Sequence, residues 1–130
     1  MKFTVLTQPV PKGRPRFTRR GFAYTPKETK IAEANFLAQA VRYAPEKPLQ
    51  EALKVSLKFF KPKPKSKPKK VIHWTTKPDL DNFIKILDSL NGVFWLDDSQ
   101  IVEIYATKEY GEPARTEIEI VSKSQENEKD

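Results

Sequence analysis

The residues best suited to chemistry lie in one short stretch, KPDLDNFIK, at positions 77–85. Asp79 and Asp81 are one residue apart, where a strand-like run ends and a helical pattern begins. Lys85 follows Asp81 by one helical turn. Closely spaced carboxylates provide the oxygen ligands that Mg²⁺ prefers, with waters and substrate phosphate oxygens completing the shell. A lysine on the same helical face could orient a carboxylate or stabilise charge developing on a phosphate.

A third carboxylate lies beyond the expected helix, in the turn at Asp97 and Asp98. A helix over 81–91 is about 16 Å long at roughly 1.5 Å per residue, so the chain must fold back for this turn to reach Asp79. The strand-like segment 99–107 permits that convergence but does not require it. If the carboxylates meet, a shared metal would lower the pKa of a water and polarise a phosphate, as phosphodiester hydrolysis requires.

Each of these signals also has a purely structural interpretation. Aspartate is a favoured N-cap and first-turn residue, and Lys85 can form an ordinary helical ion pair with Asp81. The pair Asp97-Asp98 is typical of a turn. D-x-D is also a metal motif of nucleotide-sugar transferases, although 130 residues leave little room for the nucleotide-binding domain of such enzymes. The single histidine, His73, is more often structural than catalytic in such a context.

Charge is distributed unevenly along the chain. Residues 1–77 carry 19 Lys and Arg and 4 acidic residues, a formal charge of +15, whereas residues 78–130 carry 5 and 13, a charge of −8. The basic half predicts a polyanionic partner, because each neutralised phosphate releases condensed counterions. Nucleic acid fits better than a membrane surface, since the basic residues do not follow one amphipathic helix. Carboxylates in such a protein make sense if a cation separates them from the phosphate.

The elements that must position these residues follow the order βαββαββ, which predicts an α+β fold: a mixed β-sheet with two main helices packed on it. Strands are expected over 2–7, 52–60, 71–76, 99–107 and 114–121. One helix is expected from Thr25, as N-cap, and Pro26, at the first helical position, towards Pro45. The second is expected to be capped by Asp79 or Asp81 and stopped by Asn91-Gly92.

Two basic segments are candidates for DNA contact. Residues 11–26 hold five cations interleaved with aromatics and are expected to form a loop or loose hairpin that combines arginine–phosphate contacts with base stacking. Residues 61–70, KPKPKSKPKK, are expected to form a flexible loop inside a single domain of 1–122, with a disordered tail over 123–130. The predicted DNA-binding residues are Lys12, Arg14, Arg16, Arg19, Arg20, Lys61, Lys63, Lys65, Lys67, Lys69, Lys70 and Lys77.

Composition excludes several other classes of protein. The chain has no cysteine, which rules out disulfide scaffolds, thiol nucleophiles and zinc sites built on thiolates. Its apolar runs fall well short of the roughly 18 residues that a membrane span needs. We therefore expect a cytoplasmic protein with no membrane partner and no small-molecule substrate.

Residues 77–101, KPDLDNFIKILDSLNGVFWLDDSQI, resemble the signature of the RusA family of Holliday junction resolvases, found in bacteria and their prophages. The shared pattern is K-P-D-x-D-N-x-x-K, then D-x-L, a short N-G connection and a W-x-D-D-x-Q segment. The stretch GRPRFTRRGFAYTP is also similar to many phage-type members. The connection between the helix and the tryptophan segment is shorter than in the founding type, and the Lys-Pro loop is a phage-like variation, so the base preference at the cleavage point stays open.

The resemblance implies a homodimer that cuts four-way DNA junctions by paired symmetric nicks and needs Mg²⁺ or Mn²⁺. It implies that Asp79, Asp81 and Asp98 are catalytic metal ligands and that Lys85 is the essential lysine, while Asp97 is not a main ligand. A two-fold dimer with one site per subunit would suit two cuts of like polarity. Two alternatives remain: a structure-specific DNA-binding module whose carboxylates serve only as caps, and a less selective branched-DNA nuclease.

Overall fold

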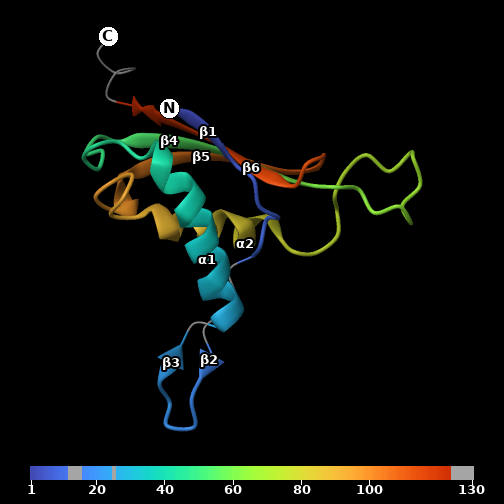
Figure 1. The fold of residues 1–130 in the computed structure, drawn as a ribbon, viewed down its shortest axis with the longest axis horizontal. Coiled ribbons are helices and arrows are strands. Elements are labelled where there is room, and N and C mark those ends of the chain that lie inside the picture. Colours follow the sequence, from blue (N-terminus) through green and yellow to red (C-terminus); the bar gives the residue numbers. More distant parts are fainter. Residues whose placement is uncertain (12–15, 25, 124–130) are drawn as a thin grey trace.

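The computed structural model describes residues 1–11, 16–24 and 26–123. Along the chain, its elements are β1 (Lys2–Val5), β2 (Arg16–Phe17), β3 (Ala23–Tyr24), α1 (Lys27–Ala40), η1 (Val41–Tyr43), β4 (Leu53–Lys61), α2 (Leu80–Ile84), η2 (Lys85–Leu90), η3 (Asp98–Gln100), β5 (Ile101–Tyr110) and β6 (Arg115–Ser122), where η marks 3-10 helices. Figure 1 shows α1 and α2 on the same side of the large sheet. The predicted α+β fold, with a mixed sheet and two helices, is confirmed.

The large sheet has the strand order β1-β6-β4-β5. β4 pairs in parallel with β5 and antiparallel with β6, which in turn pairs antiparallel with β1. The alternating sequence of β4 explains its place at the centre: Leu53, Val55, Leu57 and Phe59 are buried on the helix side, while Lys58 on the other side is exposed. Within the described part of the chain, β5 is therefore an edge strand with a neighbour on one side only.

The helices bury their apolar side chains against this face of the sheet. α1 contributes Phe36 and Ala40 to the core, and the α2–η2 segment contributes Phe83 and Leu90. The rings of Phe83 and Phe59 stack with centroids 5.3 Å apart, which ties α2 to β4. The expected second helix thus exists, but its second half is a 3-10 helix that ends at Leu90, ahead of Asn91 and Gly92.

The expected strand at 71–76 is wrong. This segment is irregular, with Trp74 buried between exposed residues such as His73, so its burial does not alternate along a strand. Both neighbouring positions of β4 are already taken by β5 and β6, which leaves no place beside it for a further strand. Trp74 instead packs on Tyr110 and Phe83, with ring centroids at 6.1 and 5.3 Å.

Residues 16–24 form a short β-hairpin, β2–β3, beyond the N-terminal end of α1 (Figure 1). Pro26 is the N-cap of α1 and not its first helical residue, because its ψ of 144° is still extended. The predicted cap Thr25, the cations Lys12 and Arg14, and the tail 124–130 lie outside the described residues. Within the described part of the chain, no helix combines the length and the apolar character needed to cross a membrane.

Candidate active site

The N-terminal end of α2 presents two carboxylates to solvent. Asp79 is the N-cap, with extended backbone angles (φ −69°, ψ 146°), and Asp81 lies in the first turn. Both side chains are exposed, while Leu80 and Phe83 turn towards the core. The Asp79 side chain makes no capping hydrogen bond to the described residues of α2, so capping does not account for this aspartate.

Two lysines border Asp79. Lys77 Nζ donates to Asp79 Oδ1 at 2.9 Å. Lys108, on β5, donates to the carbonyl oxygens of Thr76 and Pro78 at 2.8 and 2.9 Å, and so holds the chain entering α2 against the sheet. The hydrogen bond and charge of Lys77, and to a lesser degree the charge of Lys108, lower the pKa of Asp79 below its usual value. Asp79 is therefore an anion at neutral pH.

Lys85 lies at the C-terminal end of α2 and is exposed. Its Nζ donates to Asn82 Oδ1 at 3.3 Å. Among the described residues, Lys85 thus contacts Asn82 and does not form the expected ion pair with Asp81. Its ammonium group is thus close to the start of α2 and accessible to a phosphate on that surface.

Asp98 lies in a different environment, ahead of β5. Trp95, which is fully buried, donates its indole N–H to Asp98 Oδ1 at 2.7 Å. Asp97 caps η3: its side chain accepts from the Ser99 backbone and hydroxyl, and its own N–H donates to the Gln100 side chain. The Ser99 hydroxyl and backbone N–H lower the pKa of Asp97. These bonds give Asp97 a structural role in the turn.

One chain does not bring Asp98 to Asp79 and Asp81. Asp98 precedes the first residue of β5, whereas Lys108, which binds the carbonyls beside Asp79, lies near its other end; from Ile101 to Lys108 the strand spans roughly 23 Å at about 3.3 Å per residue. Figure 1 shows the same separation, with α2 and the turn before β5 at opposite ends of the helical segment. Among the residues that the structure describes, no three His, Cys, Asp or Glu side chains form a group that could hold a metal ion.

The turn before β5 is held beside the start of β4 by hydrogen bonds of its own residues. Gln100 Nε2 donates to the carbonyls of Leu49 and Glu51 at 2.8 and 3.0 Å. Leu49 also exchanges backbone hydrogen bonds with Phe94 and Leu96. The connection from η2 to β5 is therefore fixed beside the start of β4 and cannot swing back towards Asp79 without losing these bonds.

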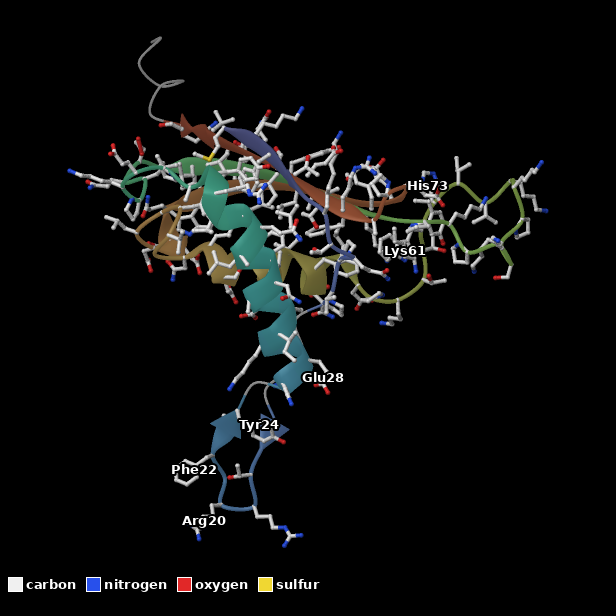
Figure 2. The ribbon with its side chains drawn as sticks, in the orientation of Figure 1. Arg20, Phe22, Tyr24, Glu28, Lys61 and His73 are labelled. Carbon is white, nitrogen blue, oxygen red and sulfur yellow. The ribbon has the colours of Figure 1, made fainter. Side chains whose placement is uncertain are left out.

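The predicted DNA-binding residues are spread over two projections of the molecule. Arg19 and Arg20 are exposed at the tip of the β2–β3 hairpin, and for Arg16 the structure describes the backbone alone. In the loop 61–70, Lys65, Lys69 and Lys70 are exposed, whereas Lys63 and Lys67 are half-buried. Lys61 lies 4.5 Å above the Trp74 ring, and Lys63 donates to the Pro68 carbonyl at 2.6 Å. Figure 2 shows Arg20 at the tip of the hairpin and Lys61 and His73 near the base of the loop.

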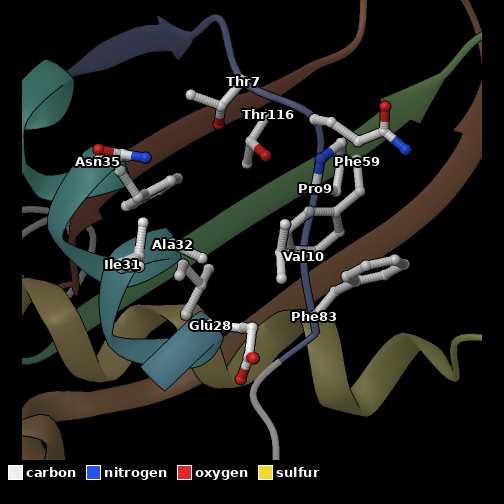
Figure 3. A pocket seen from close by; sticks show the side chains of 13 residues that line it. Thr7, Pro9, Val10, Glu28, Ile31, Ala32, Asn35, Phe59, Phe83 and Thr116 are labelled. Atoms are coloured by element: carbon white, nitrogen blue, oxygen red, sulfur yellow. The ribbon is translucent and has the colours of Figure 1, made fainter. Parts of the chain in front are cut away.

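A cavity of about 450 Å³ lies between the segment 7–10, α1 and the sheet. Figure 3 shows its largely apolar lining, with Phe59 and Phe83 among the lining side chains and Glu28 on α1. None of the four predicted catalytic residues lines it. The candidate chemistry therefore lies on the exposed end of α2, outside this cavity.

Sequence reasoning missed Lys108. In β5 the side chains of Ile104, Ala106 and Lys108 pair with the buried residues Val55, Leu57 and Phe59 of β4, so all three point to the helix side. A lysine in a core-facing register was the available signal, since it needs polar partners. It finds them in the carbonyls beside Asp79.

Comparison with known proteins agrees with the motif. The sequence matches the endodeoxyribonuclease RusA family over residues 7–121, most of the chain. It is also 35% identical over 134 aligned residues to a protein of Bacillus subtilis (strain 168) named "Uncharacterized protein YqaN", covering 92% of this chain and 94% of that protein. The chain therefore belongs to the RusA endodeoxyribonuclease family.

Proposed function

We propose that this protein is a divalent-metal-dependent endonuclease that resolves four-way DNA junctions by paired nicks, acting as a homodimer. Membership of the family supports nuclease action on Holliday junctions. The observation that carries the proposal is the exposed pair Asp79 and Asp81 at the start of α2, of which Asp79, the N-cap, makes no capping hydrogen bond to the described residues of the helix.

The surroundings of these carboxylates suit a reaction at a phosphate. Lys77, Lys85 and Lys108 place positive charge around the start of α2, where it offsets repulsion between the aspartates and DNA and stabilises charge that develops on a phosphate. Lys108 also fixes the backbone that leads into Asp79. When bound, Mg²⁺ or Mn²⁺ would polarise the phosphate and activate a water.

One chain brings together two of the three predicted metal ligands. One or two carboxylates with waters and phosphate oxygens can hold Mg²⁺, and Asp79 and Asp81 meet that minimum. The third predicted ligand, Asp98, lies at the other end of β5. A second copy of the chain is the simplest source of the missing carboxylate.

The edge strand β5 offers a surface for that second copy. Its outer backbone edge has no neighbouring strand in the described sheet, and Val102, Ile104 and Tyr105 are 62%, 46% and 57% exposed. A long edge strand with exposed apolar residues is a ready template for pairing with another chain. Two-fold symmetry makes such a pair antiparallel, because the same patch must meet itself.

Antiparallel pairing of two β5 strands would bring the start of one strand beside the end of the other. The partner's Asp98 would then approach Lys108 and, through it, the start of α2 with Asp79 and Asp81. Because α1 and α2 lie on one side of the sheet (Figure 1), an in-plane strand pair with a two-fold axis perpendicular to the sheet keeps the helices of both subunits on the same side. We therefore infer that each active site takes carboxylates from both subunits.

A single-cysteine variant tests this pairing, since the chain has no cysteine of its own. Glu103→Cys, midway between Asp98 and Lys108, lies at the two-fold axis of a pairing that sets the partner's Asp98 beside Lys108. It should give a disulfide-linked dimer on mild oxidation without any metal, because its two Cα atoms then lie within about 7 Å. Tyr24→Cys on the hairpin is the matched control and should stay monomeric after the same oxidation. Absence of a Glu103→Cys dimer would remove this pairing of β5 as the interface.

Cutting of a synthetic four-way junction, beside a linear duplex of equal length, tests the function itself. We expect paired nicks in the junction with Mg²⁺ or Mn²⁺, no cutting in EDTA, and little cutting of the duplex. Junction binding without cutting under every divalent ion would favour the binding-module alternative. Equal cutting of flaps, three-way junctions and four-way junctions would favour the less selective nuclease.

A further inference from the structure

The β2–β3 hairpin stands apart from the rest of the molecule. It lies beyond the N-terminal end of α1, away from the sheet but on the same side of it as α2 (Figure 1). None of its described side chains belongs to the hydrophobic core. Core packing therefore does not account for the described side chains of the hairpin.

The turn of the hairpin is held in one conformation by its own hydrogen bonds. Thr18 N–H donates to the Phe22 carbonyl at 2.8 Å, and the Thr18 hydroxyl accepts from Phe22 N–H at 3.1 Å. Gly21 N–H donates to the Thr18 carbonyl at 2.9 Å, and its φ of 86° is a conformation that favours glycine. These bonds define the backbone of the four-residue turn from which its side chains project.

The exposed side chains of the hairpin combine aromatic rings with cations. Phe22 and Tyr24 are 68% and 45% exposed, and Arg19 and Arg20 are exposed at the tip. Figure 2 shows Arg20 and Phe22 pointing away from the body. Single exposed apolar residues are common on protein surfaces. Aromatic rings beside arginines, on a projecting hairpin of a DNA nuclease, match the combination that stacks bases and binds phosphates.

We propose that this hairpin enters the branch point of a four-way junction, where Phe22 stacks on an exposed base and Arg19 and Arg20 bind the flanking phosphates. The proposal deepens the proposed function and rests on it. In a continuous duplex, inserting a ring requires unstacking a base step at a cost of about a few kcal/mol. At a branch point the stacking is already interrupted, so the same contact forms there at lower cost. Phe22 thereby favours junctions over duplex.

Binding measured in EDTA tests the hairpin separately from cleavage. With a four-way junction that carries 2-aminopurine at the branch point, the full-length protein should raise the fluorescence of that base as it leaves its stacked position. Phe22→Ala should abolish the rise and weaken junction binding by roughly 5- to 150-fold, the range of one lost base stack, while duplex binding stays the same. Phe22→Trp, which keeps a ring, should retain both signals.

Arginine variants separate stacking from phosphate binding. Arg19→Ala and Arg20→Ala should weaken binding to junction and duplex alike, each lowering the slope of log K against log salt by about 1. Leu6→Ala removes an exposed apolar side chain away from the hairpin and should change neither binding constant. The proposal is overturned if Phe22→Ala leaves the ratio of junction to duplex affinity unchanged, or if the wild-type protein shows no preference for the junction. Either result can occur in a protein that still cuts DNA, so failure here is distinct from failure of the nuclease proposal.

Discussion

Asp79 at the start of α2 is bordered by Lys77 and Lys108, whereas Asp98 ahead of β5 is bordered by the indole of Trp95 and by a capped turn. The first carboxylate is exposed and contacts an exposed lysine; the second is half-buried and bonded to a fully buried ring. The same residue type is thus available to a ligand at one end of the strand and held in place at the other. An acidic pair in the sequence does not reveal which environment it will have.

Asp79 and Asp98 can still bind the same metal ion if each active site takes Asp79 from one subunit and Asp98 from the other. A carboxylate has two oxygens, so Asp98 can accept from Trp95 through one and offer the other to an ion. Trp95 would then fix the orientation of the rigid ligand, while Asp79 and Asp81 adapt from the exposed helix end. Substitutions at these positions separate the two roles, and Asp81→Asn should have the largest effect.

The first prediction is that Asp81→Asn nearly abolishes nicking of a four-way junction. We expect the rate to fall by about 100-fold or more, the scale on which loss of one charge-stabilising group acts. Binding in EDTA should persist or tighten slightly, because a negative charge near the phosphates is removed. Glu46→Gln removes one exposed charge elsewhere and should leave nicking unchanged. Normal nicking by Asp81→Asn would exclude this residue from the mechanism.

The second prediction concerns mixed dimers of two inactive variants, Asp81→Asn and Asp98→Asn. If each site combines Asp81 of one subunit with the partner's Asp98, a mixed dimer contains one intact site, and an exchanged equimolar mixture should recover about a quarter of the wild-type nicking rate. The products should be single nicks and not paired cuts. If each site lies within one subunit, mixing restores nothing, and an inactive mixture beside active wild type would refute the shared site.

The third prediction separates structure from chemistry at Asp98. Asp98→Ala leaves the buried Trp95 N–H without its acceptor, so the free energy of unfolding should fall by about 1–3 kcal/mol in urea titrations. Asp98→Asn keeps an acceptor oxygen and should be much less destabilising. Asp81→Asn, on an exposed helix end, should change stability little. If Asp98→Ala is as stable as the wild type, the hydrogen bond between Trp95 and Asp98 does not stabilise the fold.

Much of the fold follows from local patterns. The alternation in β4 and β6 and the apolar spacing in α2–η2 predict these elements closely, whereas α1 buries Phe36 and Ala40 but leaves Ile31 exposed. The segment 71–76 has the composition of a strand, yet it is irregular: β5 and β6 occupy both sides of β4, and Trp74 packs on Phe83 and Tyr110. Which strands flank β4 depends on contacts distant in sequence, and no local pattern contains that information.

The candidate site was predictable to a similar degree. The spacing of Asp79 and Asp81 predicts neighbouring carboxylates at a helix start, and the structure has them there. The position of Asp98 was not predictable, because it depends on the bonds of Gln100 and Leu49 that keep the turn beside the start of β4. Those bonds join residues about fifty positions apart, and neither partner stands out in the sequence.

The fourth and smallest expected effect is on the pKa of Asp79. Lys77→Ala removes the hydrogen bond and the charge that lower this pKa most, so it should rise towards the usual value of 3.8, while the weaker influence of Lys108 remains. Because the folded-state pKa is depressed, the stability that the Lys77 contact contributes is present above about pH 4 and is lost as the pH falls through the folded-state pKa. Side-chain carboxyl NMR titration without divalent ions, on wild type and variant, measures the change. Lys47→Ala removes an exposed lysine outside this site and should leave the pKa of Asp79 unaltered. If the pKa of Asp79 is also unaltered in Lys77→Ala, the ion pair between Lys77 and Asp79 is not formed in solution. Asp79 would then be held at the helix start only by the backbone that Lys108 binds.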